Sequence, residues 1–207
     1  MTEITTRSFY NTIEKAATAE FKDRGSKFIA YAFPVQTAEE FKKELQSLKK
    51  EHPKAVHHCF AYRIGTTGDN FRVNDDGEPS GSAGRPILGQ IDSKEITNVA
   101  VIVVRYFGGT LLGVPGLINA YKTVTSLSLQ VVPVIQKQIE VIYEIHFDYT
   151  KMNGVMQILK QYNCSVLSQE MQLFCNILVG IPVSRLKEII YKLKEAYGLE
   201  MNELPKC

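Results

Sequence analysis

The sequence predicts an α+β protein of two domains, 1–136 and 137–207. Residues 1–136 combine strand-like alternation with helical periodicity. Pro133 and the polar run 136–138 then interrupt the pattern. From residue 137 onward the segments follow the order strand, helix, strand, strand, helix, which is typical of a ferredoxin-like domain. The 207 residues suffice for two small domains that each bury a core.

The first expected elements are a hairpin and a helix. Two β-leaning runs lie between Thr12 and Val35, and Gly25 in the intervening "RGS" is expected at the turn. The next run, "TAEEFKKELQSLKKEH", predicts a helix, because Thr37 followed by Glu40 forms a capping box and Pro53 ends the pattern. Its apolar face consists of Phe41, Leu45 and Leu48.

The middle of the chain predicts two strands, a long loop and two helices. "HHCFAYRIG" alternates like a strand, and "NVAVIVVRYF" reads as a buried strand. Between them, the Gly, Pro, Ser and Asp content of Phe71–Gln90 predicts a loop. A short helix is expected to begin at Pro86, because proline suits the first helical position and the residue before it resists helical geometry. "GGTLLGVPG" then opens a long helix, "LINAYKTVTSLSLQVV".

Beyond the boundary the predicted elements are short and regular. They are the strand "IEVIYEIHF", the helix "YTKMNGVMQILKQY", the strands "CSVLSQ" and "MQLFCNILVGI", the helix "SRLKEIIYKLKEAYG" and a short last strand.

Composition excludes several classes of protein. The formal net charge of +2 is too small for a typical non-specific DNA-binding protein. No window has the apolar length of a membrane span or the core of a signal peptide, so a cytoplasmic location is expected. The cysteines at positions 59, 164, 175 and 207 are spaced too irregularly for a disulfide framework or a zinc site.

The loop Phe71–Gln90 is the first candidate site. The free N–H groups and dipole of the helix expected at Pro86 would offer a seat for a phosphate or carboxylate. Alternatively, an acid of the loop folds back as an internal anion and makes the loop a rigid turn. Sequence alone leaves both possibilities open. The loop-ordering acids would be Asp75, Asp76 and Glu78.

The second candidate is "RYFGGTLLGVPGLINAYK", which contains no acid. Gly108 and Gly113 have the glycine spacing of a phosphate loop, but Val114 and Pro115 stand where Lys and Ser or Thr are needed. The segment is therefore not a nucleotide P-loop. The apolar stretch Leu111–Leu117 is expected either to pack in the core or to face a partner.

No catalytic residue, metal site or cofactor is predicted. Strand alternation sends His57 and Cys59 to one face and His58 to the other, so three ligands cannot converge from this run. Ser80 lies in "GEPSG", which lacks the G-x-S-x-G nucleophile elbow. The protein is expected to be non-enzymatic.

The motifs "HHCFAYRIG", "NDDGEPSGSAGRPIL" and "VVRYFGGTLLGVPGLINAY" resemble the IMPACT family, in its bacterial YigZ-like branch. The resemblance implies a first domain similar to a ribosomal small-subunit protein domain and to domain IV of elongation factor G, and a second similar to domain V of that factor. Eukaryotic IMPACT looks like a translational regulator that carries an additional N-terminal module. A general link to translation is what the resemblance implies for this chain, without the eukaryotic partner.

These observations predict a cytoplasmic protein that binds RNA or the ribosome and regulates translation. The alternatives are an enzyme or small-ligand protein that holds a phosphorylated or carboxylated metabolite at the Gly-rich loops, and a protein-interaction module with a partner in translation control. The expected nucleic-acid or anion contacts are Arg72, Ser80, Gly81, Ser82, Gly84, Arg85, Arg105, Tyr106, Gly108, Gly109 and Lys122.

Overall fold

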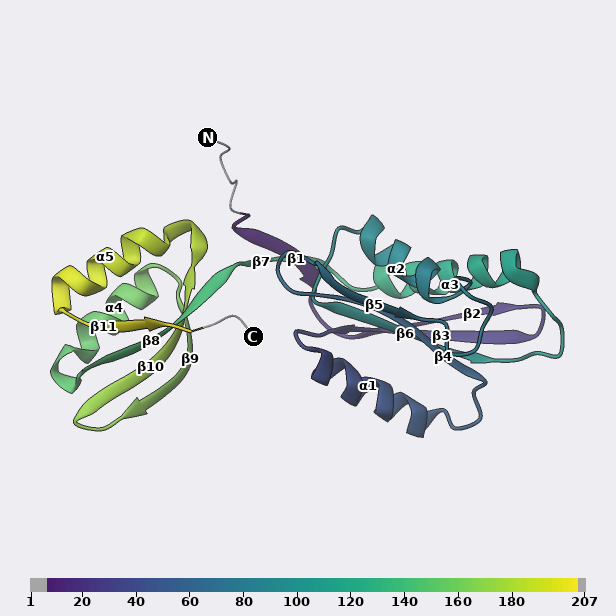
Figure 1. Ribbon diagram of the computed structural model, residues 1–207, viewed down its shortest axis with the longest axis horizontal. Coiled ribbons are helices and arrows are strands. Elements are labelled where there is room, and N and C mark those ends of the chain that lie inside the picture. Colours follow the sequence, from purple (N-terminus) through teal and green to yellow (C-terminus); the bar gives the residue numbers. More distant parts are fainter. Residues whose placement is uncertain (1–6, 205–207) are drawn as a thin grey trace. The chain divides into compact units, whose positions relative to one another are not determined.

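A computed structural model describes residues 7–204, which form two units (Figure 1). The larger unit is Tyr10–Lys137, and the smaller combines residues 138–204 with residues 7–9. The division into two independently folding domains at residue 136 stays a prediction.

The larger unit is built on a five-stranded antiparallel sheet with the order β2-β3-β6-β4-β5. Helices α2 and α3 cover one face of this sheet and α1 covers the other (Figure 1). A separate two-stranded sheet pairs β1 with β7. The strands are β1 Phe9–Ile13, β2 Ala17–Asp23, β3 Ser26–Pro34, β4 His57–Ile64, β5 Asn70–Asn74, β6 Val99–Tyr106 and β7 Val134–Gln138; the helices are α1 Ala38–Glu51, α2 Gly84–Ser93 and α3 Gly113–Gln130.

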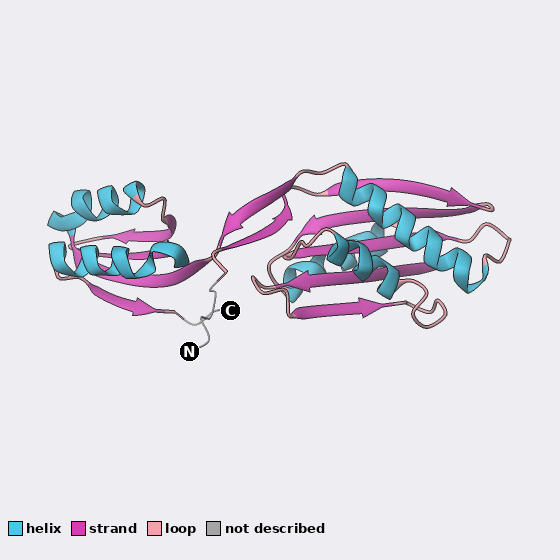
Figure 2. Cartoon of the chain, turned by 90° about the horizontal axis from the view of Figure 1, so that it is seen from above, coloured by secondary structure: helices cyan, strands magenta, loops and turns pink. Residues whose placement is uncertain are grey.

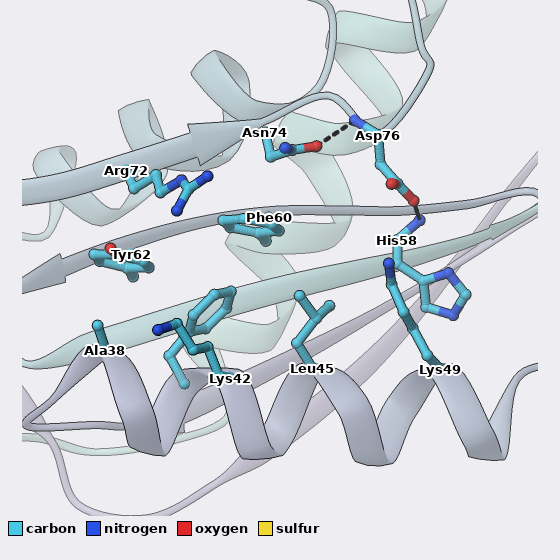
Figure 3. A pocket seen from close by; sticks show the side chains of 11 residues that line it. Ala38, Lys42, Leu45, Lys49, His58, Phe60, Tyr62, Arg72, Asn74 and Asp76 are labelled. Carbon is cyan, nitrogen blue, oxygen red and sulfur yellow. Dashed lines mark hydrogen bonds between the residues drawn. The ribbon is translucent and has the colours of Figure 1, made fainter.

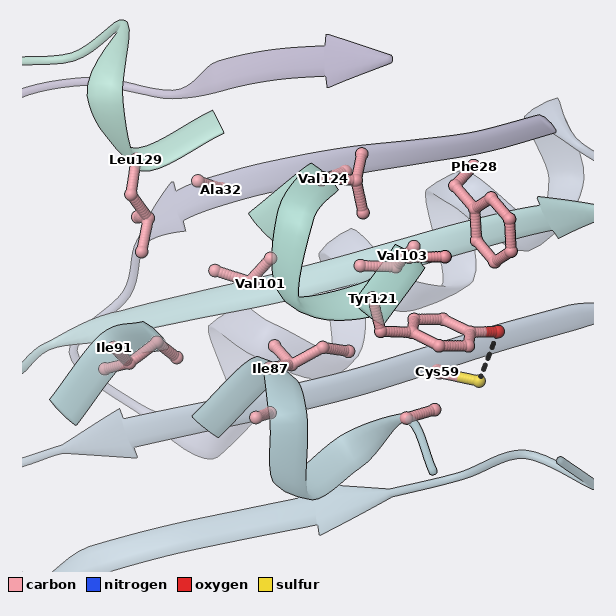
Figure 4. Close-up of a cluster of buried hydrophobic side chains, with 14 of the residues drawn as sticks. Phe28, Ala32, Cys59, Ile87, Ile91, Val101, Val103, Tyr121, Val124 and Leu129 are labelled. Carbon is pink, nitrogen blue, oxygen red and sulfur yellow. Dashed lines mark hydrogen bonds between the residues drawn. The ribbon is translucent and has the colours of Figure 1, made fainter. Parts of the chain in front are cut away.

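The central strand β6 separates two hydrophobic cores. Its residues are buried up to Arg105, because helices cover both faces of the sheet. Toward α2 and α3 the core contains Phe28, Cys59, Val103 and Tyr121, with the ring of Tyr121 edge-on to that of Phe28 (Figure 4). The core beneath α1 contains Phe41, Leu48, Phe60, Tyr62 and Ile102.

Local signals account for the position of α1. The side chain of Thr37 accepts a hydrogen bond from the Glu40 backbone at 3.1 Å, as expected of the N-cap residue. The Glu40 carboxylate accepts a hydrogen bond from the backbone N–H of Gln36. A capping box would use the N–H of Thr37, one residue later.

The expected loop is shorter than predicted, and the helix after it begins earlier. Residues 71–74 continue strand β5, and α2 begins at Gly84, so the prediction of a helix start at Pro86 was wrong by two residues. Gly84 packs so closely on β5 that a Cβ atom there would lie 2.8 Å from the backbone nitrogen of Asn74. Asp75 accepts hydrogen bonds from the first N–H groups of this helix, which lets it begin before the proline.

The smaller unit has the order β-α-β-β-α-β, and its antiparallel sheet has the order β11-β8-β10-β9. This is the ferredoxin-like arrangement. Helices α4 and α5 lie on one face of the sheet (Figure 2). Its elements are β8 Glu140–Asp148, a 3₁₀ turn Tyr149–Lys151, α4 Met152–Gln161, β9 Ser165–Met171, β10 Phe174–Pro182, a 3₁₀ turn Val183–Arg185, α5 Leu186–Tyr197 and β11 Glu200–Glu203.

Candidate functional site

Asp75 closes the Gly-rich loop onto the start of α2. Its carboxylate accepts backbone hydrogen bonds from Gly81 at 2.8 Å, Ala83 at 3.0 Å and Gly84 at 2.8 Å. Partial burial opposes ionisation of this carboxyl, but these N–H groups and the nearby charge of Arg85 outweigh it and lower its pKa. The anion at this helix end is therefore a side chain of the protein itself.

Glu78 and Arg105 form a buried ion pair behind the same loop. The two side chains are 3% and 6% exposed, and Arg105 Nη1 donates to Glu78 Oε1 at 2.6 Å. The hydroxyl of Tyr121 donates to the same oxygen at 2.8 Å. A carboxylate with two such donors is held in one position, so the loop is anchored to β6 and α3.

Strand register explains how Arg105 reaches this place. Antiparallel pairing sets Arg105 opposite Phe28 of β3 on one side and opposite His57 of β4 on the other. The three side chains therefore share one face of the sheet. The guanidinium carbon lies 5.4 Å from the centroid of the Phe28 ring and 5.7 Å from that of Phe107.

Asp76 ties the loop to β4 from the other side. It has a positive φ of 44°. Its backbone N–H donates a hydrogen bond to the side-chain oxygen of Asn74 at 2.6 Å. Its carboxylate accepts the backbone N–H of His58 at 2.6 Å, and its carbonyl lies 2.7 Å from His57 Nδ1. All three predicted loop acids thus contact partners within the larger unit.

Cys59 is enclosed within this network. Its sulfur lies 3.0 Å from the Asp75 carbonyl oxygen and 3.2 Å from the Tyr121 hydroxyl (Figure 4). Burial is the main cause that raises the pKa of this thiol, and burial likewise raises the pKa of Tyr121. Both groups stay protonated, so Cys59 is not a reactive nucleophile.

The second Gly-rich loop packs against the β2–β3 turn. A Cβ atom on Gly108 would lie 1.9 Å from the carbonyl carbon of Gly25, so only glycine fits at this crossing. The Gly108 N–H donates to the Ser26 hydroxyl at 3.2 Å. The following glycine, Gly109, has a φ of 87° and is exposed.

The predicted contact residues do not form one cluster. Arg105 is buried and paired, whereas Arg85 and Lys122 are exposed on α2 and α3. Arg72 lines a cavity against α1 on the opposite face of the sheet. Tyr106 belongs to that second face too, because its hydroxyl lies 2.8 Å from Nδ1 of His52, which follows α1.

The predicted loop residues also have different environments. Ser80 is exposed, and Gly81 has a φ of 76°. Ser82 is fully buried, and its hydroxyl has no hydrogen-bond partner within residues 7–204. Sequence reasoning missed Tyr121, whose place on the apolar face of α3 concealed its role as a donor to Glu78.

A shallow groove of about 300 Å³ lies along α3 and is bordered by Gln90 of α2. It is lined by Gln90, Asn119, Lys122, Thr123, Ser126, Leu127 and Gln130. This lining contains a cation and no acid. The groove is therefore suited to hydrogen bonding and to contact with negative charge.

The apolar stretch at the start of α3 divides between core and surface. Leu112 and Leu117 are buried at 8% and 5% exposure. Leu111 is 82% exposed and Val114 is 45% exposed. The two outcomes that the sequence left open, packing in the core and exposure at the surface, therefore both occur within this stretch.

Metal-binding clusters and membrane-spanning helices are both absent from the described residues. Among residues 7–204, no group of three or more His, Cys, Asp or Glu side chains is placed to hold a metal ion. No helix in that range is long and apolar enough to cross a membrane.

Comparison with known proteins gives consistent matches. Residues 24–129 match the model of the Impact N-terminal domain. An "IMPACT family member" of Haemophilus influenzae is 31% identical over 94% of this chain and 91% of its own length. "IMPACT family member YigZ" of Escherichia coli is 31% identical over 84% of this chain and 85% of its own. "IMPACT family member YvyE" of Bacillus subtilis is 36% identical over 73% and 70%, respectively.

A solved structure shares the fold along the chain. It is titled as the crystal structure of a hypothetical protein, is 27% identical, and aligns with a TM-score of 0.75 over 97% of this chain and 100% of its own. The motifs of both Gly-rich loops lie within the region that matches the family model. The chain therefore belongs to the IMPACT family, as its motifs predicted.

Proposed function

We propose that this protein is a non-enzymatic factor in the regulation of translation that binds RNA on the ribosome. The observation that carries the proposal is the acid-free groove along α2 and α3, with Lys122 in its lining. RNA recognition combines cations that contact phosphate with polar groups that contact sugars and bases. The groove offers both kinds of group, six of its lining residues coming from α3 and Gln90 from α2.

Two exposed cations of α2 and α3 support an RNA ligand. Lys122 and Arg85 are exposed, and within residues 7–204 neither forms an ion pair with an acid. Unpaired cations are free to replace the counterions of a phosphate backbone. Amide and hydroxyl groups of α3 and the amide of Gln90 then supply hydrogen bonds.

The locked loop supplies rigidity to this surface. Arg85 lies in the first turn of α2, whose start is held by Asp75 and whose preceding loop is anchored through Glu78. A contact residue on a pre-organised element loses less conformational entropy on binding than one on a mobile loop. The internal charges of the loop therefore support binding without contacting the ligand.

Family membership directs the proposal toward translation. The family resemblance implies a first domain similar to a ribosomal small-subunit protein domain and to domain IV of elongation factor G, and this implied similarity favours the ribosome as the source of RNA. The second domain, for which the resemblance implies similarity to domain V, would then orient the first. Fold similarity alone does not assign function, so the groove remains the basis of the proposal.

The test is co-sedimentation of the full chain with ribosomes and with separated subunits across a salt series. The wild-type protein is expected to associate at low salt and dissociate as salt rises. The double variant Arg85→Gln/Lys122→Gln should bind more weakly, and its log–log salt slope should fall by about 0.7 to 0.9 for each phosphate that the variant no longer neutralises.

The matched control is Lys43→Gln/Lys50→Gln, which removes two exposed charges from α1. It should bind like the wild-type protein. If both double variants show equally reduced affinity and slope, the groove is not the binding surface. If the wild-type protein does not sediment with ribosomes even at low salt, the ribosomal assignment is wrong.

A further inference from the structure

A cavity of about 330 Å³ lies between α1 and strands β4 and β5, on the face of the sheet opposite α2 and α3 (Figure 3). Its size is within the range of small-ligand sites. Its lining consists of Ala38, Phe41, Lys42, Leu45, Lys49, His58, Phe60, Tyr62, Arg72, Asn74 and Asp76. Nothing in the function proposed above uses this cavity.

The middle of the cavity is aromatic. The ring centroid of Phe41 lies 4.6 Å from that of Phe60 and 4.9 Å from that of Tyr62. Phe60 and Tyr62 are two positions apart in β4, so their side chains lie on the same face of the sheet. Their rings are nearly parallel. These side chains offer a surface for a planar ring.

The polar groups are mostly cationic. Lys42 and Lys49 approach from α1 and Arg72 from β5 (Figure 3). Neither Lys49 nor Arg72 has an ion-pair partner among the described side chains, and Lys42 is 3.6 Å from Glu39. The single acid in the lining, Asp76, already accepts the His58 backbone N–H at 2.6 Å. The excess of positive charge favours an anion.

His58 is the sharpest indication of a missing partner. The residue is 7% exposed, yet its Nε2 has no hydrogen-bond partner in the part of the chain that the structure describes. A buried polar atom without a partner costs free energy, and such atoms are uncommon in native proteins. His58 is one of the residues that line the cavity, together with Lys49 and Arg72.

We propose that this cavity binds a small organic anion in which a phosphate or carboxylate is attached to a planar ring. The ring packs against Phe60 and Tyr62, the anionic group contacts Arg72 and Lys49, and a polar group of the ligand bonds Nε2 of His58. The aromatic wall, the unpaired cations and the orphaned nitrogen each meet one part of this ligand.

The test is titration of the full chain with phenyl phosphate, benzoate, phenol and inorganic phosphate, followed by calorimetry and by amide and imidazole NMR. Phenyl phosphate or benzoate should bind more tightly than phenol or inorganic phosphate and should shift the His58 resonances. The tighter of the two ring-bearing anions identifies the charged group. Equal or absent binding of all four probes would overturn the proposal.

Variants locate the site. Arg72→Gln and Lys49→Gln should each weaken binding of the better probe by about tenfold, as expected when one charge-assisted hydrogen bond is removed. Lys43→Gln and Lys50→Gln change charges on α1 outside the cavity and should leave binding unchanged. Equally weakened binding in all four variants would show non-specific charge attraction and would contradict the proposed site.

Binding of the small anion in the cavity is expected to be independent of RNA binding. Arg85→Gln/Lys122→Gln should retain the probe, and Arg72→Gln should retain association with ribosomes, because the two sets of residues lie on opposite faces of the sheet. Loss of the probe in Arg85→Gln/Lys122→Gln, with folding intact, would contradict the assignment to the cavity.

Discussion

The two faces of the larger sheet differ in how a buried carboxylate on one and a buried imidazole on the other are satisfied. On the α2–α3 face, the buried carboxylate of Glu78 accepts hydrogen bonds from Arg105 and Tyr121. On the α1 face, His58 is 7% exposed and its Nε2 has no partner within residues 7–204. The carboxylates of the acid-rich loop thus have internal partners, and the described atoms left without one on that face include the Ser82 hydroxyl and Nε of Arg105. On the α1 face the described atom without a partner belongs to the imidazole of His58. Charge next to a glycine-rich loop is therefore poor evidence for a ligand unless its partners are known.

The largest expected effect comes from removing the buried ion pair of the α2–α3 face. Arg105→Met leaves the Glu78 carboxylate buried without its cation, and we expect a loss of about 3–5 kcal/mol in the free energy of unfolding of the larger unit. The measurement is denaturant-dependent hydrogen exchange of the β6 amides, which reports this unit separately from the other.

A second variant separates charge from packing in the same experiment. Adding Glu78→Gln to Arg105→Met removes the stranded charge and should recover part of the stability. A single variant as stable as the wild-type protein would show that the ion pair does not anchor the loop. A double variant less stable than the single one would contradict the account of a buried uncompensated charge.

A smaller effect is expected from the helix start. Asp75→Asn keeps the size of the side chain but removes its charge and one acceptor, so we expect a loss of about 1–2 kcal/mol at neutral pH and faster exchange of the Gly84 amide. Asp69→Asn is the control, because Asp69 is exposed and has no hydrogen bond or ion pair among the described residues. Equal stability of the two variants would contradict the capping role of Asp75.

The pH dependence of this loss has a definite sign. The folded pKa of Asp75 is lowered, so its stabilisation is fully present above the unfolded pKa of about 3.9 and disappears as the pH falls through the folded value. Wild-type protein and Asp75→Asn should therefore converge in stability in acid. A difference that persists unchanged in strong acid would contradict the contribution of the ionised carboxylate.

The smallest expected effect on stability comes from protonation of His58 on the α1 face. Burial is the main cause that lowers the pKa of His58, and the charges of Lys49 and His52 assist it. The charge of Asp76 and a hydrogen bond to the backbone of Leu48 oppose this shift. Because the folded state disfavours the imidazolium, stability should fall as the pH drops below the unfolded pKa of about 6.5. NMR titration of the imidazole should give a midpoint below that value. A bound aromatic anion should raise the midpoint, since it favours the charged ring.

This titration also has a clear contrary result. A His58 midpoint at or above about 6.5 without ligand would show that the side chain is better solvated or better paired than its burial indicates. The contrast between the two faces would then lose its main support.

Strong local signals in the sequence predicted much of the fold. Thr37 and Glu40 mark the start of α1, Gly25 marks a turn, and the apolar run of β6 marks a buried strand. Strands β1, β5 and β7 escaped prediction, and the latter two consist mainly of exposed or half-buried residues. An edge strand of this kind exists through pairing with its neighbour, and such pairing leaves only a weak pattern in the strand itself.

The sequence by itself determined which residue types stand together along the chain: acids beside glycines, an acid-free helix, and a chain belonging to the IMPACT family. Only the tertiary structure decided which charges meet. Arg105 pairs with an acid 27 positions away and Tyr121 with the same acid 43 positions away, because strand register and helix packing bring them to one face. The cavity under α1 has the same origin, since its walls come from three elements that no local pattern relates.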